Sequence, residues 1–303
     1  MANALALIPI ILLLIADSGL VEAFRVKGLA EPESFLADSA GDGFFISNVN
    51  GKPGEPDGNG FITRLKDDGT VEALKWAPPG PHGMPALDAP KGLAIWLPDR
   101  EDQRAPVTRW LVIADLTRLV VVDLTGTEPP SIVDLAPAGG RFLNDVAVAS
   151  DGTVYATDTA ARCVWKVLPD YTARRRNAPP EPLLDLGEHA PNGLLLRGKN
   201  LAIVTWGLGK LLEASREGKP KATMAAFAAD PAPENLDGLA EFDGDLWFSS
   251  WAPGAVYRLR DGRAEPVLTG LTTPADISID AKRRLLLVPF MESGEAAAYR
   301  IPE

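Results

Sequence analysis

Three observations predict an all-β protein, a six-bladed β-propeller with four-stranded blades in a single domain. First, one sequence unit occurs six times, at spacings of 58, 53, 48, 45 and 38 residues. Such a drifting period is typical of blades whose loops vary in length. Second, the runs within each unit are rich in Val, Ile, Leu and aromatic residues and are bounded by Asp-Gly and other glycine turns, which is typical of short antiparallel strands. Third, no long segment beyond the N-terminal region keeps a helical period.

The chain begins with an apolar run over residues 4–16. This run is shorter than a membrane span but has the length of a signal-peptide core. Small residues at Val21 and Ala23 suit cleavage after Ala23, so we expect a signal peptide over 1–23 and a propeller domain over 24–303. The expected location is then secreted, most simply in a bacterial periplasm, with no membrane attachment after cleavage. No Lys or Arg precedes the run, so an uncleaved anchor or an early start codon remains an alternative.

Each unit opens with a turn, a polar residue, a small or acidic residue and an apolar strand. A second strand follows, expected at 43–48, 110–115, 153–158, 200–206, 245–251 and 284–290. A third is expected at 60–65, 118–124, 163–168, 210–215, 255–260 and 296–301. A more variable fourth strand follows in five units, while the sixth unit ends without one. Residues 24–29 form a strand with no partner in their own unit. Pairing this strand into the last blade would close the ring and hide both sheet edges.

The polar position of each unit is expected to face the central channel, because the first strand of a propeller blade lines that channel. The six aligned residues are Glu33, Lys91, Asn144, Asn192, Asp237 and Ala275. Two carboxylates and two carboxamides offer only oxygen ligands, which suits a hard cation. We therefore expect one divalent cation, Ca²⁺ first, with Mg²⁺, Mn²⁺ or Zn²⁺ as alternatives. The competing interpretation is that each residue caps its turn.

Four motifs in chain order resemble those of the senescence-marker-protein (regucalcin) and gluconolactonase family. They are Glu33 with Asp38 five residues later, Asn144-Asp145 followed by an Asp-Gly turn, Pro191-Asn192-Gly193-Leu194, and Asp237-Gly238-Leu239. The resemblance covers about residues 24–301 and implies a six-bladed propeller with a metal in its channel. It further implies that Glu33, Asn192 and Asp237 are metal ligands, that Asn144 is a ligand or a substrate contact, and that Asp237 is the catalytic base.

Four further residues are candidates for substrate binding. Relatives carry a substrate-binding Arg two residues before the Asn of the third blade, whereas here Arg141 lies three before Asn144. Lys91 brings a cation into the ring, where it would hold an anionic substrate or form an ion pair with Glu33. Trp206 and Trp251 would wall the pocket or pack between blades. The loop over 48–60 would cover the mouth as a lid.

Composition excludes several classes of function and partner. The net charge of −11 argues against nucleic acid as a partner. One cysteine and two histidines rule out cysteine-rich zinc sites and argue against a catalytic His pair. We expect a monomeric, metal-dependent hydrolase of lactone or related ester rings, acting on a small molecule. The alternatives are a secreted propeller that binds a metal ion and a small metabolite or protein without turnover, and a propeller enzyme of the arylesterase or streptogramin-lyase type, which would be expected to use histidine.

Overall fold

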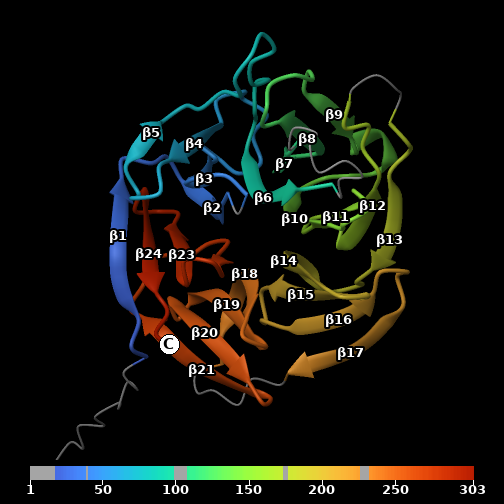
Figure 1. The fold of residues 1–303 in the computed structure, drawn as a ribbon. Coiled ribbons are helices and arrows are strands. Elements are labelled where there is room, and N and C mark those ends of the chain that lie inside the picture. Colours follow the sequence, from blue (N-terminus) through green and yellow to red (C-terminus); the bar gives the residue numbers. More distant parts are fainter. Residues whose placement is uncertain (1–17, 39, 99–107, 173–176, 226–231) are drawn as a thin grey trace, which may run out of the picture.

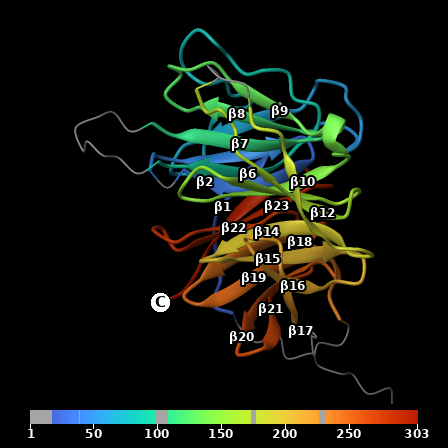
Figure 2. The ribbon, with the colours of Figure 1, turned by 90° about the vertical axis from the view of Figure 1, so that its right-hand side faces the viewer.

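The computed structural model describes residues 18–38, 40–98, 108–172, 177–225 and 232–303. These ranges form six four-stranded antiparallel sheets arranged around one axis, with a single short 3₁₀ helix, η1 (Ala136–Ala138). Figure 1 looks into the ring, and Figure 2 shows it from the side, with the second blade above and the fifth below. The prediction of a six-bladed β-propeller is therefore confirmed. No helix in the described ranges is long and apolar enough to cross a membrane.

Each blade runs from an inner strand at the axis to an outer strand at the rim. The first three blades are β2 (Pro32–Ala37), β3 (Phe44–Asn48), β4 (Phe61–Leu65), β5 (Val71–Ala73); β6 (Pro90–Trp96), β7 (Trp110–Asp115), β8 (Arg118–Asp123), β9 (Ser131–Asp134); and β10 (Leu143–Val148), β11 (Val154–Asp158), β12 (Cys163–Val167), β13 (Glu181–Asp185). The last three are β14 (Ala190–Arg197), β15 (Asn200–Trp206), β16 (Leu211–Ser215), β17 (Pro220–Ala225); β18 (Glu234–Phe242), β19 (Asp245–Ala252), β20 (Ala255–Arg260), β21 (Arg263–Thr269); and β22 (Ser278–Asp280), β23 (Leu285–Phe290), β24 (Glu295–Arg300), β1 (Val21–Lys27).

The N-terminal strand completes the sixth blade, as predicted. Strand β1 pairs antiparallel with β24, from Val21 opposite Arg300 to Lys27 opposite Glu295. The cleavage predicted after Ala23 would therefore remove the first three residues of the strand. Most of the predicted signal peptide, residues 1–17, lies outside the described ranges, and cleavage remains a prediction.

The hydrophobic core lies between neighbouring blades. One cluster of buried side chains joins each adjacent pair around the ring, including the pair formed by the last and first blades. At that closing junction Val26 of β1 is buried, and Phe24 packs against Phe44 with ring centroids 5.4 Å apart. Cys163 is buried in the cluster between the second and third blades. Because every blade packs against two others, the ring holds the inner strands in fixed positions around the axis.

Candidate functional site

A β-bulge in each of the first five inner strands turns the predicted ring residue out of the sheet. Pairing between inner and second strands breaks between Pro32 and Phe35 in the first blade, and the same break recurs in the next four blades. The ring residue and its successor thus lie outside the ladder, and a bulge of this kind re-aims side chains. The motif that the five units share at this position therefore corresponds to the β-bulge.

The inner strands approach one another closely at the bulges, which explains the glycines that follow ring residues. A Cβ atom on Gly193 would lie 2.2 Å from the carbonyl oxygen of Asp237, and one on Gly238 would lie 2.0 Å from the backbone nitrogen of Ile277. Neither position has room for a side chain. The close approach brings side chains from opposite sides of the ring to one small space.

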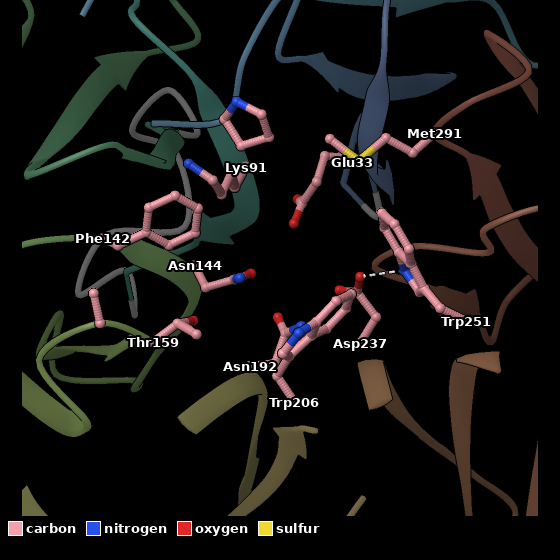
Figure 3. A pocket seen from close by; sticks show the side chains of 12 residues that line it. Glu33, Lys91, Phe142, Asn144, Thr159, Asn192, Trp206, Asp237, Trp251 and Met291 are labelled. Atoms are coloured by element: carbon pink, nitrogen blue, oxygen red, sulfur yellow. Dashed lines mark hydrogen bonds between the residues drawn. The ribbon is translucent and has the colours of Figure 1, made fainter. Parts of the chain in front are cut away.

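Four oxygen-bearing side chains converge on that space (Figure 3). Glu33, Asn144, Asn192 and Asp237 line one pocket and are all buried. Each has one oxygen with no hydrogen-bond partner, namely Glu33 Oε2, Asn144 Oδ1, Asn192 Oδ1 and Asp237 Oδ1. Only two other buried side-chain polar atoms in the described ranges share this condition. Buried polar atoms normally have a partner, since leaving one unpaired is costly. Four such oxygens around one space fit a hard divalent cation.

The set of donors consists of two carboxylates and two carboxamides. The described part of the chain contains no group of three or more His, Cys, Asp or Glu side chains placed to hold a metal. The two asparagines are therefore needed to complete a ligand set, and all four donors are oxygen. This composition agrees with the preference of Ca²⁺, Mg²⁺ and Mn²⁺ for oxygen ligands.

Burial makes this site unfavourable for negative charge in the absence of a cation. Burial raises the pKa of Asp237 to about 8, and the nearby charge of Asp276 adds to the shift. Burial likewise raises the pKa of Glu33 well above its ordinary value, with further contributions from Asp237 and Asp276 and an opposing one from Lys91. A divalent cation would reverse this effect, because its charge favours the ionised carboxylates.

One hydrogen bond orients the Asp237 carboxylate. Trp251 Nε1 donates to Asp237 Oδ2 over 2.7 Å, drawn as the dashed line in Figure 3. The bond engages one carboxylate oxygen and leaves Oδ1 as the unpartnered atom. Trp251 also packs edge-to-face against Trp206, with ring centroids 5.0 Å apart. Both tryptophans line the pocket, as predicted. They also pack against each other between neighbouring blades, so the two alternative roles both apply.

Lys91 provides a buried positive charge beside the ring. Its Nζ donates to the carbonyl oxygen of Ala89 and lies 4.2 Å from the centroid of the Phe142 ring. Burial lowers the pKa of Lys91 to about 8, while the charges of Glu33 and Asp115 oppose that shift. Lys91 and Glu33, both in the described part of the chain, interact through their charges but form no ion pair at contact distance. The ammonium is held by a carbonyl and an aromatic face, and it lines the same pocket.

The remaining walls of the pocket are largely apolar. Pro53, Phe142, Ala160 and Met291 join the two tryptophans around a cavity of about 400 Å³. Pro53 belongs to the loop over 48–60, so that loop reaches the pocket as the lid hypothesis requires. Phe142, Thr159, Ala160 and Met291 line the pocket although the sequence did not predict them as site residues.

A repeat position links several of these walls. In the strand ladders Asp158 pairs with Leu143 and Thr205 pairs with Pro191, so Thr159 and Trp206 occupy the same place in their blades. Trp251 and Met291 occupy it in the last two blades. The second strands predicted from the sequence end at Asp158, Trp206 and Trp251 and so align these three residues, whereas the observed register places both tryptophans one position later. With that shift, the repeat itself would have identified Thr159 and Met291.

Three polar residues at the ends of second strands accept hydrogen bonds from backbone N–H groups and do not face the pocket. Asn48 Oδ1 accepts from the backbone N–H of Ala30, and Asp115 Oδ1 accepts from Asp88 and Ala89. Asp158 accepts from the backbone N–H groups of Arg141 and Phe142. These three buried side chains fix the turn that enters each inner strand, so their role is to position the ring residues.

The other predicted contacts lie outside the pocket. Arg141 has an exposed side chain and does not line the cavity, because its backbone rather than its side chain is anchored at this end of the blade. The sixth ring residue, Ala275, is fully buried under the pocket wall and packs with Ala89, Val49 and Met291. His189 is half-buried and His82 exposed, and neither lines the cavity.

Comparison with solved structures supports the propeller fold. No family model and no curated protein matches the sequence. Among solved structures, a gluconolactonase from Xanthomonas campestris superposes with a TM-score of 0.66 at 19% identity, covering 95% of this chain and 91% of that one.

The chain has the fold of the gluconolactonase-like propellers. A second such structure, a putative gluconolactonase, gives a TM-score of 0.63 at 20% identity over 93% of this chain and 92% of the other. A streptogramin B lyase is also similar, with a TM-score of 0.60 at 14% identity over 93% and 97% of the two chains. Similarity at this level of identity concerns the fold, and the chemistry has to be argued from the site.

Proposed function

We propose that this protein hydrolyses the ester bond of a lactone or a related cyclic ester with the help of one divalent cation. The observation that carries the proposal is the convergence of four buried, unpartnered oxygens in a pocket that also holds an aromatic wall and a buried ammonium. The likeness in fold to two gluconolactonase structures supports the same reaction class. Glu33, Asn144, Asn192 and Asp237 would hold the cation, with Ca²⁺ the first candidate.

The bound cation would supply a Lewis acid for the carbonyl oxygen and lower the pKa of a water molecule. Asp237 accepts the proton of the attacking water, so it acts as both ligand and general base. The hydrogen bond from Trp251 keeps its carboxylate in one orientation. Water adds to the acyl carbon, the ring C–O bond breaks, Asp237 returns the proton to the leaving alkoxide, and a hydroxy acid leaves. Lys91 provides positive charge for the alkoxide that forms when the bond breaks.

The decisive experiment measures proton release during lactone hydrolysis by metal-stripped protein lacking residues 1–23. Aldonolactones and simple γ- and δ-lactones are tested with Ca²⁺, Mg²⁺, Mn²⁺ or Zn²⁺ added back, beside Asp237→Asn and the exposed control Asp261→Asn. Turnover that requires metal and is lost only in Asp237→Asn supports the proposal. If protein that binds metal hydrolyses none of the lactones with any of the metals, the proposal is contradicted.

A second candidate is binding without turnover. Two of the six ring positions carry residues that are not oxygen ligands, Ala275 and Lys91, and both are buried. A secreted propeller of this kind would bind a metal ion together with a small metabolite or protein partner at the channel mouth. Saturable binding with no hydrolysis would favour this function. A lyase, as in the streptogramin B lyase of similar fold, would instead release an unsaturated product without consuming water.

A further inference from the structure

We infer that the ligand of this pocket carries an apolar body, an alkyl or aryl group attached to or fused with the lactone ring, rather than the hydroxyl groups of a sugar lactone. The inference rests on the proposed function for the reacting ring, but its evidence is separate. It comes from the walls of the cavity and from the hydrogen bonds that the polar lining residues already make.

The walls offer contact surface and almost no hydrogen-bonding capacity. Trp206, Trp251, Phe142, Met291 and Pro53 surround the cavity, and Figure 3 shows the aromatic rings facing the space above the ring of oxygens. Aromatic and thioether side chains bind apolar surface through burial and dispersion. A hydroxyl group against these walls would lose its water without gaining a partner.

Several polar atoms in the lining already make hydrogen bonds within the protein. Thr159 Oγ1 donates to the carbonyl oxygen of Pro191 over 2.7 Å, and Trp251 Nε1 donates to Asp237. The unpartnered oxygens of the four ring residues belong to the proposed cation site. Lys91 donates one of its three N–H groups to Ala89 and lies over Phe142, so its remaining donors face the reacting end of the ligand. The groups left for a ligand therefore stand mostly at the ring, where the ester reacts, and among the described lining residues the walls add only the indole N–H of Trp206.

The size of the cavity agrees with a substituted ring. About 400 Å³ lies within the range of pockets that enclose small molecules. An unsubstituted lactone would leave much of the wall without contact. A δ-lactone with a short alkyl chain, or a lactone fused to a benzene ring, would fill the space beside Trp206.

The first test compares kcat/KM for δ-decalactone, dihydrocoumarin, δ-valerolactone and δ-gluconolactone in the Ca²⁺-loaded protein. We expect the two apolar-bodied lactones to exceed δ-gluconolactone by about a hundredfold, since an apolar wall rejects added hydroxyl groups to about that extent and their lost hydration is not replaced. Trp206→Ala should reduce the preference for δ-decalactone over δ-valerolactone by about tenfold, and Trp206→Phe should restore part of it. Leu208→Ala, an exposed position near Trp206 in sequence, is the matched control and should leave the preference unchanged.

A second measurement separates this inference from the proposed reaction. Binding of the δ-lactam that corresponds to δ-decalactone, and of gluconolactam, is followed by calorimetry in wild type and Trp206→Ala. Tight binding of the alkyl lactam that depends on Trp206 supports the inference even if no lactone is hydrolysed. Preferred binding or turnover of the sugar compounds overturns it while the hydrolase proposal stands. Failure of both lactams to bind overturns it as well.

Discussion

Trp251 holds Asp237 by a 2.7 Å hydrogen bond to Oδ2, and this bond divides the two oxygens of the carboxylate between two tasks. Oδ2 is engaged by the indole, while Oδ1 stays free beside the unpartnered oxygens of Glu33 and the two asparagines. A residue from the wall of the pocket thereby sets the orientation of a residue in its floor. The substrate wall and the proposed cation site are consequently parts of one arrangement.

Removing this hydrogen bond by Trp251→Phe should weaken the site without dismantling it. The bond favours the ionised carboxylate, so its loss raises the pKa of Asp237. We expect kcat to fall about tenfold, as for other outer partners of metal ligands, and the rise of kcat/KM with pH to move to higher pH. Trp206→Phe, which removes no bond to Asp237, should leave that midpoint in place. An identical pH profile in Trp251→Phe and wild type would contradict the orienting role.

Calcium should stabilise the protein through Glu33. Metal binding to the folded state raises Tm in proportion to affinity and concentration, and we expect Glu33→Gln to reduce Ca²⁺ affinity by at least about tenfold because ligand charge sets affinity. The metal-free variant should be at least as stable as metal-free wild type, since a buried charge is removed. Calorimetric titration and thermal melts test both expectations, with the exposed Glu31→Gln as control. Equal Ca²⁺ affinity in Glu33→Gln and wild type would remove Glu33 from the site.

The buried carboxyl of Asp276 should make stability depend on pH. Burial raises its pKa from 3.8 to about 7. Its contribution to the free energy of unfolding is therefore full below about pH 4 and is lost as the pH rises through about 7. At pH 8 the folded protein holds a buried charge, which Asp276→Asn removes while retaining an acceptor for Ser34.

Asp276→Asn should therefore be more stable than wild type at pH 8, by about 1–4 kcal/mol, since each unit of raised pKa corresponds to about 1.4 kcal/mol. At pH 5 the difference should shrink. Urea unfolding at both pH values measures it. Asp261→Asn, an exposed turn position with a φ of 50° that asparagine tolerates, should show no such pH dependence. A constant difference at both pH values would show that the effect does not come from titration of Asp276.

Closure of the ring should depend on the part of β1 that enters the core. A chain starting at Phe24 keeps Phe24 and Val26 and should melt close to a chain starting at Ser18. A chain starting at Gly28 loses both side chains and exposes the edge of β24. We expect its Tm to fall by about 10 °C or more, or the chain to aggregate, because buried apolar contacts and an edge pairing are lost together. Similar melting of the two shorter chains would contradict closure by β1.

The regular features of this protein could be read from its repeat. Strand order, blade number, closure by the N-terminal strand and the five polar ring residues all follow from a local pattern of apolar runs and turns. Such features are local, because the alternation of side chains and the chemistry of turns depend on neighbouring residues. The repeat then transfers one local rule to six places around an axis.

The walls of the pocket could not be read in the same way. Phe142 and Pro53 come from two loops whose lengths differ, and Arg141 is exposed outside the pocket with its backbone N–H held by Asp158. The pairing register between strands, with its bulges, also placed Trp206 and Trp251 one repeat position later than the sequence alignment did.

The sequence by itself determined the propeller, its closure and which residues face the axis. Tertiary structure alone decided that four of their oxygens have no partner, that Trp251 binds Asp237, and that an apolar wall encloses the space above them. The reason is physical: hydrogen-bond satisfaction and cavity shape depend on distances between segments far apart in the chain, which only the packing of complete blades sets.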